Sequence, residues 1–334
     1  MKQIRISLAV AALAAVAALL VGFASSRATA SRSAVSPAVA LQNAFVGVFR
    51  KVSPSVVQIQ TAEGLGSGIV FDAKGDIVTN DHVVGTATSF TVTTSTGKRL
   101  KGKLVGAFPA DDLAVIKVSG GNLHPASFAD SSKLRVGDLA MAIGNPLGLA
   151  SSVTEGIVSA LGRQEPEGTG VVLQNAIQTS AAINPGNSGG ALVDIGGRVI
   201  GIPTLAAADP QLGGAAAGIG FAIPSNVVRS IASQIVEHGH VVNSGRAYLG
   251  VSIGDTGNGV YVGAVSAGSP AAKAGVKAGD VIVAVDGTPT PTSDDLGTLL
   301  AAHKPGQTVT LKVVRQSGAT TQIKVTLGEY PGGK

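Results

Sequence analysis

The sequence has 334 residues, of which 45% are hydrophobic and 13% charged, and it contains no cysteine and no tryptophan. This composition excludes a long disordered protein, and the length is typical of two or three folded domains. The absence of cysteine excludes disulfides, thiolate nucleophiles and cysteine-based metal sites. The net charge of +5 does not indicate nucleic-acid binding, because the first 30 residues hold three basic residues and no acid, and no basic run follows.

Residues 1–30 have the pattern of a targeting segment, with a basic start, an uncharged apolar run over residues 6–24 and small residues ending at Ala30. The run is long enough to cross a bilayer, so two outcomes stay open: a signal peptide cleaved after Ala30, or a retained membrane anchor. In both cases the rest of the protein is exported. Residues 31–45 are rich in Ser, Ala and Val and are expected to form a tether.

Residues 46–240 consist mainly of short β-branched runs separated by Gly, Pro and Asp turns, which predicts an all-β barrel or sandwich. The spacing leaves no room for crossover helices and so disfavours a parallel α/β sheet. A change of period near residue 225 predicts one helix that closes this module. We expect Ser225 as its cap and Gly239 as its end.

Residues 246–330 form a second, smaller module with strands and two short helices. Ser269 and Gly275 are placed to cap and end the first helix, and Ser293 opens the second. The segment between the two modules is expected to be a linker.

Ser188 lies in the stretch AAINPGNSGGALVD, where it completes a Gly-x-Ser-x-Gly pattern. The pattern alone is weak in a chain with 46 glycines, and it gains meaning only with a base and an acid. An α/β-hydrolase elbow is excluded, because no apolar strand precedes the serine and no helix follows it. The histidines after Ser188 also lie at a helix end or in the other module.

His82, an acid at Asp111 or Asp112, and Ser188 follow one another in the order found in chymotrypsin. His82 follows an apolar strand, and the two aspartates directly precede another. In this arrangement His82 is the base, the aspartate orients it, and Ser188 attacks a carbonyl carbon. The backbone N–H groups of Gly186 and Ser188 are expected to stabilise the oxyanion that forms.

The sequence resembles the HtrA/Deg family of serine proteases over about residues 45–330. Seven blocks match that family in order, and the last module resembles its PDZ domain. The resemblance implies a chymotrypsin-like double β-barrel followed by a small α+β PDZ domain. The matching blocks are TNDHVV, DDLAVIKV, AIGNPLGL, SVTEGIVSAL, IQTSAAINPGNSGGALV, GRVIGIPTL and GIGFAIPSN, with YLGV and AGVKAGDVIVAVDG in the PDZ module.

The resemblance assigns the catalytic acid to Asp112 and leaves Asp111 as a turn residue. It places the primary specificity pocket at Ala182, with its flanks at Ile183, Gly201, Ile202 and Thr204. An alanine at the base favours cleavage after small aliphatic residues. Ser180 departs from the aspartate that many relatives carry after the Gln-Thr pair, which puts a local contact in doubt and leaves the triad intact.

The resemblance further implies a PDZ loop for peptide carboxy termini, formed by Tyr248, Leu249, Gly250 and Val251. It implies an ATP-independent endopeptidase of protein quality control that acts on unfolded polypeptides, assembles as a homotrimer and needs no metal or cofactor. Three alternatives stay open: a chaperone, a peptide sensor with a latent protease, and a protease dedicated to one signalling cleavage. Rotation of the peptide group before Gly186 would remove an oxyanion donor and provide such latency.

Overall fold

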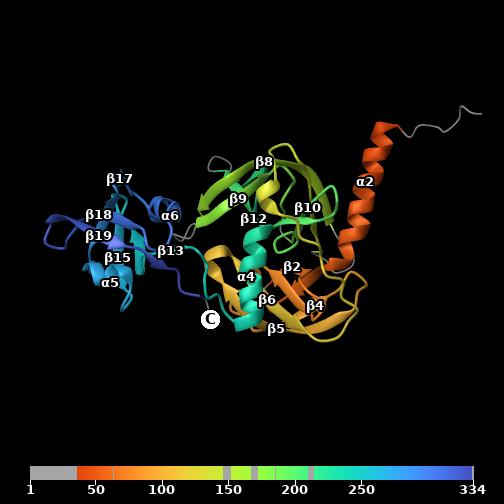
Figure 1. The fold of residues 1–334 in the computed structure, drawn as a ribbon, viewed down its shortest axis with the longest axis horizontal. Helices are drawn as coiled ribbons and strands as arrows, with labels where there is room; N and C mark the ends of the chain where they lie inside the picture. Colours follow the sequence, from red (N-terminus) through yellow and green to blue (C-terminus); the bar gives the residue numbers. More distant parts are fainter. Residues whose placement is uncertain are drawn as a thin grey trace, which may run out of the picture. The chain divides into compact units, whose positions relative to one another are not determined.

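The computed structural model describes residues 36–62, 64–145, 152–166, 172–184, 186–209 and 214–332 (Figure 1). The chain divides after Val46 into two units, and the second contains all elements except the first turns of helix α2 (Pro37–Val52). This helix begins inside the segment expected to be a tether. The targeting segment and the possible cleavage point at Ala30 lie outside the described residues. No helix in the described part of the chain has both the length and the apolar character needed to cross a membrane.

Six antiparallel strands form a first closed barrel in the order β1-β2-β3-β6-β5-β4. Their side chains point alternately into and out of the barrel, and in β1, β3 and β6 most side chains on both faces are buried. Ile59, Ile77 and Ile116 belong to the core of this barrel and are fully buried. The turn η1 (Ser53–Ser55) leads into the barrel. The strands are β1 (Val56–Gln60), β2 (Leu65–Val70), β3 (Asp76–Thr79), β4 (Ser89–Thr93), β5 (Arg99–Phe108) and β6 (Leu113–Val118).

The second barrel repeats this topology. Its order is β10-β11-β12-β9-β8-β7, which becomes the order of the first barrel when its strands are counted from β7. Short 3₁₀ turns η2 (Pro109–Asp111) and η3 (Ser131–Lys133) lie before β6 and β7. The strands are β7 (Leu139–Gly144), β8 (Ser152–Pro166), β9 (Val172–Thr179), β10 (Ala191–Asp194), β11 (Val199–Asp209) and β12 (Gly214–Pro224).

Helix α4 (Ser225–His238) leaves the second barrel and packs against β5 and β6 of the first (Figure 1). Val228, Ile231 and Ile235 form its buried face, as the spacing predicted. Gly239 ends the helix in a left-handed conformation, which confirms the predicted stop. The predicted cap was wrong, because the hydroxyl of Ser225 donates to the carbonyl of Ala129 instead of accepting from the helix.

The last module is a sheet in the order β14-β15-β16-β18-β19, with β17 paired to β16 and a separate pair of β13 and β20. Ser269 accepts from the N–H of Ala272, so its predicted role as a cap is confirmed. The elements are β13 (Ala247–Tyr248), β14 (Val251–Asp255), β15 (Val260–Val265), α5 (Pro270–Ala274), β16 (Val281–Val285), β17 (Thr288–Pro289), α6 (Ser293–Ala301), β18 (Thr308–Val314), β19 (Thr320–Thr326) and β20 (Gly328–Glu329).

Candidate active site

His82 and Asp112 form a close pair in the first barrel. His82 lies on the one-turn helix α3 (Asp81–Val84) directly after β3, and Asp112 lies between η2 and β6. The ring Nδ1 of His82 is 2.9 Å from Oδ2 of Asp112, and the backbone N–H of His82 donates to Oδ1 at 3.0 Å. The Asp112 side chain is 5% exposed and that of His82 is 49% exposed. A buried acid therefore orients a ring whose other side reaches solvent.

Two further groups hold Asp112 in place. The hydroxyl of Thr204 on β11 donates to Oδ2, and the side-chain amide of Asn80 donates to the backbone carbonyl of Asp112 at 3.0 Å. Asp112 has a φ of 49°, a left-handed conformation that aspartate tolerates better than most residues. Thr204 thus supports the acid, whereas the sequence analysis placed it beside the substrate pocket. In the sequence, Thr204 could have been noticed as a hydroxyl-bearing residue within the otherwise apolar strand VIGIPTL.

Ser188 reaches the same site from the second barrel, on the loop between β9 and β10. Its hydroxyl donates to the carbonyl of Thr204 at 3.1 Å. Ser188, Gly186 and His82 line one cleft with a volume of about 350 Å³. The cleft therefore lies where the two barrels meet and brings together the predicted base, nucleophile and oxyanion loop.

The loop around Ser188 is fixed by its own backbone. The N–H of Asn187 donates to the carbonyl of Asn184 at 3.0 Å, and the N–H of Gly190 donates to the carbonyl of Asn187 at 2.9 Å. Gly186 has a φ of 97°, which only glycine adopts readily. No described residue accepts a hydrogen bond from the N–H of Gly186 or of Ser188. These two donors are the ones that the sequence analysis assigned to the oxyanion.

The two adjacent aspartates, which spacing alone left open, have different partners. Asp112 contacts His82, whereas Asp111 forms a buried ion pair with Arg246 at the start of the last module. Arg246 also donates to the carbonyl of Val172 at 2.6 Å. Burial raises the pKa of Asp111, and the positive charge of Arg246 opposes that rise.

Asp81 is an acidic residue that the sequence analysis did not single out. It precedes His82, and partial burial, followed by the negative charge of Asp112, raises its pKa to about 6. The adjacent His82 opposes this rise. Asp81 is therefore a second carboxyl beside the base, with a pKa well above its ordinary value.

The residues predicted for the specificity pocket lie around the loop that carries Ser188. Ala182 is exposed, and its carbonyl accepts from the hydroxyl of Thr154 at 2.8 Å. Ile183 is 9% exposed, and Gly201 is buried on β11. Ile202 is fully buried, so its side chain supports the barrel and does not line an open pocket. The hydroxyl of Ser180, the residue that departs from the family pattern, accepts from the N–H of Ile157 at 3.0 Å.

The predicted PDZ loop borders a second cavity, with a volume of about 200 Å³. Tyr248, Leu249, Gly250 and Val251 contribute to its wall, together with residues of β14 and α6. Ala110, Val172 and Gln174 of the two barrels also line this cavity. Gly250 has a φ of 85°, and a side chain there would collide with Ser269. No group of three or more His, Asp or Glu side chains in the described part of the chain is placed to hold a metal ion.

Two closed barrels of one topology, with a histidine–aspartate pair facing a serine between them, define the class of trypsin-like serine peptidases. Residues 66–202 match the trypsin-like peptidase domain, and residues 247–327 match the PDZ domain. These matches and the topology confirm the predicted fold.

The chain is 41% identical over 279 residues to the periplasmic pH-dependent serine endoprotease DegQ of Escherichia coli K12, and it covers 60% of that protein. It is 43% identical over 281 residues to the periplasmic serine endoprotease DegP of the same strain and covers 58% of it. These alignments take in 80% and 81% of the present chain. The chain thus spans somewhat less than two thirds of the length of these relatives.

A solved structure of the HtrA-type protease AlgW with tripeptide is 35% identical, with a TM-score of 0.59. The match covers 86% of the present chain and 97% of that structure. The chain therefore belongs to the HtrA-type serine protease family.

Proposed function

We propose that the protein is an ATP-independent serine endopeptidase that cleaves unfolded or damaged polypeptides through an acyl-enzyme on Ser188. The observation that carries this proposal is the cleft lined by both Ser188 and a histidine that a buried aspartate holds. Because Nδ1 of His82 contacts Asp112, Nε2 is the nitrogen that acts as base. In the reaction the serine hydroxyl gives its proton to that nitrogen and no longer donates to the carbonyl of Thr204.

The proposed reaction proceeds in two halves. Ser188 Oγ attacks the substrate carbonyl carbon while His82 takes its proton, and the N–H groups of Gly186 and Ser188 stabilise the oxyanion. His82 then gives the proton to the leaving amine, which departs and leaves the acyl-enzyme. Water, activated by the same histidine, hydrolyses the ester and restores the serine. Asp112 remains ionised throughout and stabilises the imidazolium.

Digestion of an unfolded model protein such as casein tests this activity. The purified protein without its targeting segment (residues 1–30), called the soluble form, is compared with its Ser188→Ala variant. The fragments are mapped by mass. We expect cleavage by the parent alone. Cleavage by both proteins would contradict the role of Ser188, and cleavage by neither would favour a chaperone or a latent protease.

For substrate choice, we propose a small pocket with Ala182 at its base and Ile183 and Gly201 at its flanks. An alanine offers no charge to a lysine or arginine side chain, so cleavage after valine or alanine is expected. The same fragment map supplies the measurement. Frequent cleavage after lysine or arginine would contradict the assignment.

For the last module, we propose that a free peptide carboxy terminus binds at the loop Tyr248–Val251 and that the peptide extends along strand β14. The cavity beside β14 and α6 supports this site, as does its open strand edge. Fluorescence anisotropy of a labelled peptide with a hydrophobic carboxy terminus measures binding. The same peptide with an amidated terminus is the control, and equal affinity for both would contradict the proposal.

We further propose that the protein works in protein quality control in a bacterial cell envelope as a homotrimer. The two E. coli relatives are named as periplasmic, which supports export. Membrane association through residues 6–24 remains a prediction. Analytical ultracentrifugation of the soluble form tests the trimer, and a monomer across the micromolar range would contradict it. A dedicated signalling protease would differ by leaving casein uncut while cleaving one native partner.

A further inference from the structure

Ser67 is a fully buried residue on strand β2 that the proposed mechanism does not use. It belongs to the first barrel, yet three of its hydrogen bonds reach residues of the second. Its backbone N–H donates to the carbonyl of Ser188 at 2.9 Å. Its hydroxyl donates to the carbonyl of Gly186 at 2.5 Å and accepts from the N–H of Asn145 at 2.8 Å. One side chain therefore joins β2 to two loops across the meeting line of the barrels.

The position of Ser67 is itself tightly constrained. The hydroxyl of Thr79 on the neighbouring strand donates to the carbonyl of Ser67 at 2.7 Å. A Cβ atom at Gly189 would lie 2.2 Å from that carbonyl oxygen, so the loop packs directly on this strand. A fully buried polar group whose donor and acceptor are both used holds its partners in one arrangement.

The hydrogen bond from Ser67 to the carbonyl of Gly186 restricts a part of the loop whose backbone could otherwise rotate. Gly186 has a φ of 97°, and as glycine it has access to backbone conformations closed to other residues. Holding its carbonyl fixes the peptide group between Gly186 and Asn187. The N–H of Gly186 belongs to the preceding peptide group, so it can then change direction only by rotation about the two backbone bonds of Gly186 itself. The adjacent contact from the Ser67 N–H holds the carbonyl of the nucleophile in the same way.

We infer that Ser67 is a positioning residue for the oxyanion hole. Its hydroxyl holds the Gly186 carbonyl so that the N–H groups of Gly186 and Ser188 point to one place in the cleft. This inference rests on the proposed peptidase activity. It explains why a hydroxyl belongs at this buried position of β2, where the strand otherwise presents glycine and apolar residues.

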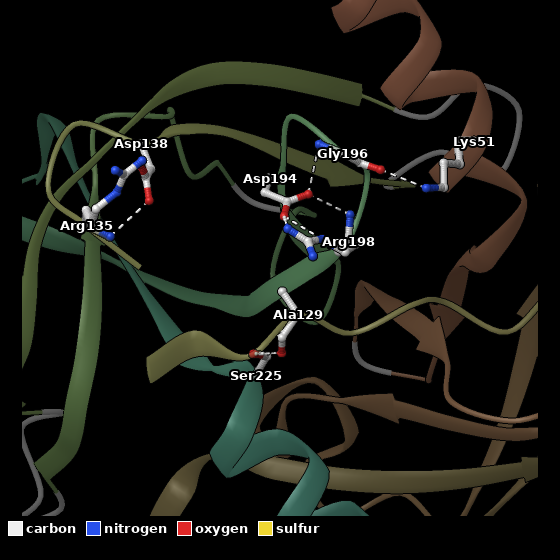
Figure 2. Close-up of polar contacts among 8 residues, drawn as sticks. All are labelled: Lys51, Ala129, Arg135, Asp138, Asp194, Gly196, Arg198 and Ser225. Carbon is white, nitrogen blue, oxygen red and sulfur yellow. Dashed lines mark hydrogen bonds and ion pairs between the residues drawn. The ribbon is translucent and has the colours of Figure 1, made fainter. Parts of the chain in front are cut away.

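Ser225 provides a matched control for the loss of a buried serine hydroxyl. It is fully buried, and its hydroxyl donates to the carbonyl of Ala129 at 2.9 Å (Figure 2). This bond has the same chemistry as the bond from Ser67 to Gly186, but neither of its residues lines the cleft. The substitution Ser225→Ala therefore reports the structural cost alone.

The experiment compares the parent, Ser67→Ala, Ser225→Ala and Ser188→Ala in the full soluble form. It measures kcat and KM on a peptide substrate and the unfolding midpoint. It also measures the affinity of each protein, except Ser188→Ala, for a peptide aldehyde, which forms an oxyanion on Ser188. For Ser67→Ala we expect kcat to fall about tenfold to a hundredfold with KM within about twofold, because the donors serve the transition state. The affinity of Ser67→Ala for the aldehyde should fall by a similar factor. Ser225→Ala should keep the kcat and the aldehyde affinity of the parent, while its unfolding midpoint falls about as much as that of Ser67→Ala.

The inference is overturned if Ser67→Ala keeps kcat within about twofold of the parent, or if its aldehyde affinity falls no more than that of Ser225→Ala. Should Ser67→Ala fail to fold, Ser67→Cys takes its place, because a thiol is a weaker donor of similar size. An intermediate loss of kcat is then expected, and full activity would overturn the inference. A parent that cleaves nothing would instead count against the proposed function.

Discussion

At the scale of single residues, the hydroxyl of Thr204 is expected to matter because it donates to the buried carboxylate of Asp112. The substitution Thr204→Val keeps the shape of the side chain and removes the donor. A hydrogen bond to a charged group contributes about 1.5–3 kcal/mol, so kcat/KM should fall at least about tenfold. Steady-state kinetics on a peptide substrate measures the change.

Thr204→Ser is the control for this prediction, since it loses a methyl group and retains the donor. It should keep kcat/KM within about threefold of the parent. Equal losses in the serine and valine variants would show that packing of the methyl group, and not the hydrogen bond, supports Asp112.

The carboxyl of Asp81 predicts a dependence of stability on pH. Its pKa is about 6 in the folded protein against an ordinary value of 3.8, so folding favours its protonated form. Its contribution to stability is full below about pH 4 and is lost as the pH rises through 6. Asp81→Asn stays neutral, so its free energy of unfolding relative to the parent should rise between pH 4 and pH 8. Solvent screening of this half-buried group limits the gain to about 1 kcal/mol.

Urea unfolding at several pH values measures this difference. Glu155→Gln, which removes an exposed carboxyl of β8, is the matched control for the loss of one carboxyl. If the difference between Asp81→Asn and the parent is constant between pH 4 and pH 8, the raised pKa of Asp81 is wrong.

The sequence was informative about residues whose chemistry requires a fixed order along the chain. A serine nucleophile needs a base from elsewhere in the fold, and the structure places the two residues proposed for these roles, His82 and Ser188, in one cleft. Spacing could not show which of the two aspartates contacts His82. The difference depends on the left-handed backbone of Asp112 and on the ion pair of Asp111 with Arg246, which lies 135 positions later in the chain. The contacts of Thr204 with Asp112 and of Ser67 with Gly186 were also hidden, since they join the two barrels.

At the scale of elements, helix α6 begins with a capping box. The hydroxyl of Thr292 accepts from the N–H of Asp295, and the carboxylate of Asp295 accepts from the N–H of Thr292. Thr292→Ala should lower the stability of the last domain by about 1 kcal/mol, because one N–H of the first turn loses its acceptor. Thermal unfolding of the full chain, followed by circular dichroism, measures the shift.

Thr292→Ser retains the hydroxyl and should unfold close to the parent temperature. An alanine variant as stable as the serine variant would show that water replaces the cap at no cost.

Of the two serines predicted as helix caps, one acts as a cap and the other does not. Ser269 caps its helix as expected, while Ser225 is drawn away by a carbonyl 96 positions earlier in the chain.

At the scale of the whole molecule, the ion pair of Arg246 and Asp111 connects the start of the last domain to the first barrel. Arg246→Met would leave a buried carboxylate without its partner, and we expect a loss of about 3–5 kcal/mol in the free energy of unfolding. Adding Asp111→Asn to this variant should restore part of the loss, because the unpaired charge is removed. Urea unfolding of the parent, both single variants and the double variant gives the coupling between the two residues.

Additive effects of the two substitutions would contradict the prediction, since they would mean that the ion pair contributes no coupling.

The ion pair also affects how a truncated protein without the last domain should be tested. Removal of residues 246–334 deletes Arg246 together with the domain, so the truncated protein should carry Asp111→Asn if its stability is to be judged fairly. Labelling by an active-site serine probe should survive this truncation.

The double β-barrel was expected from the family resemblance, whereas the pattern of short strands alone could not predict the repeated topology. Short apolar strands indicated a barrel or a sandwich, but strand order depends on which edges meet after folding. No sequence repeat marks the two halves, although their strands follow one order. The short β-branched runs indicate which segments are strands, and many unrelated sequences contain such runs.

Closure of both barrels has a consequence for aggregation. Unfolded polypeptides carry extended segments that add readily to any exposed strand edge. In the described part of the chain, each barrel strand has a neighbour on both sides, so the catalytic half offers such segments no template. The last domain, whose sheet ends in β14 and β19, is where strand addition remains possible. The two barrels can therefore contact unfolded chains without pairing with them edge to edge.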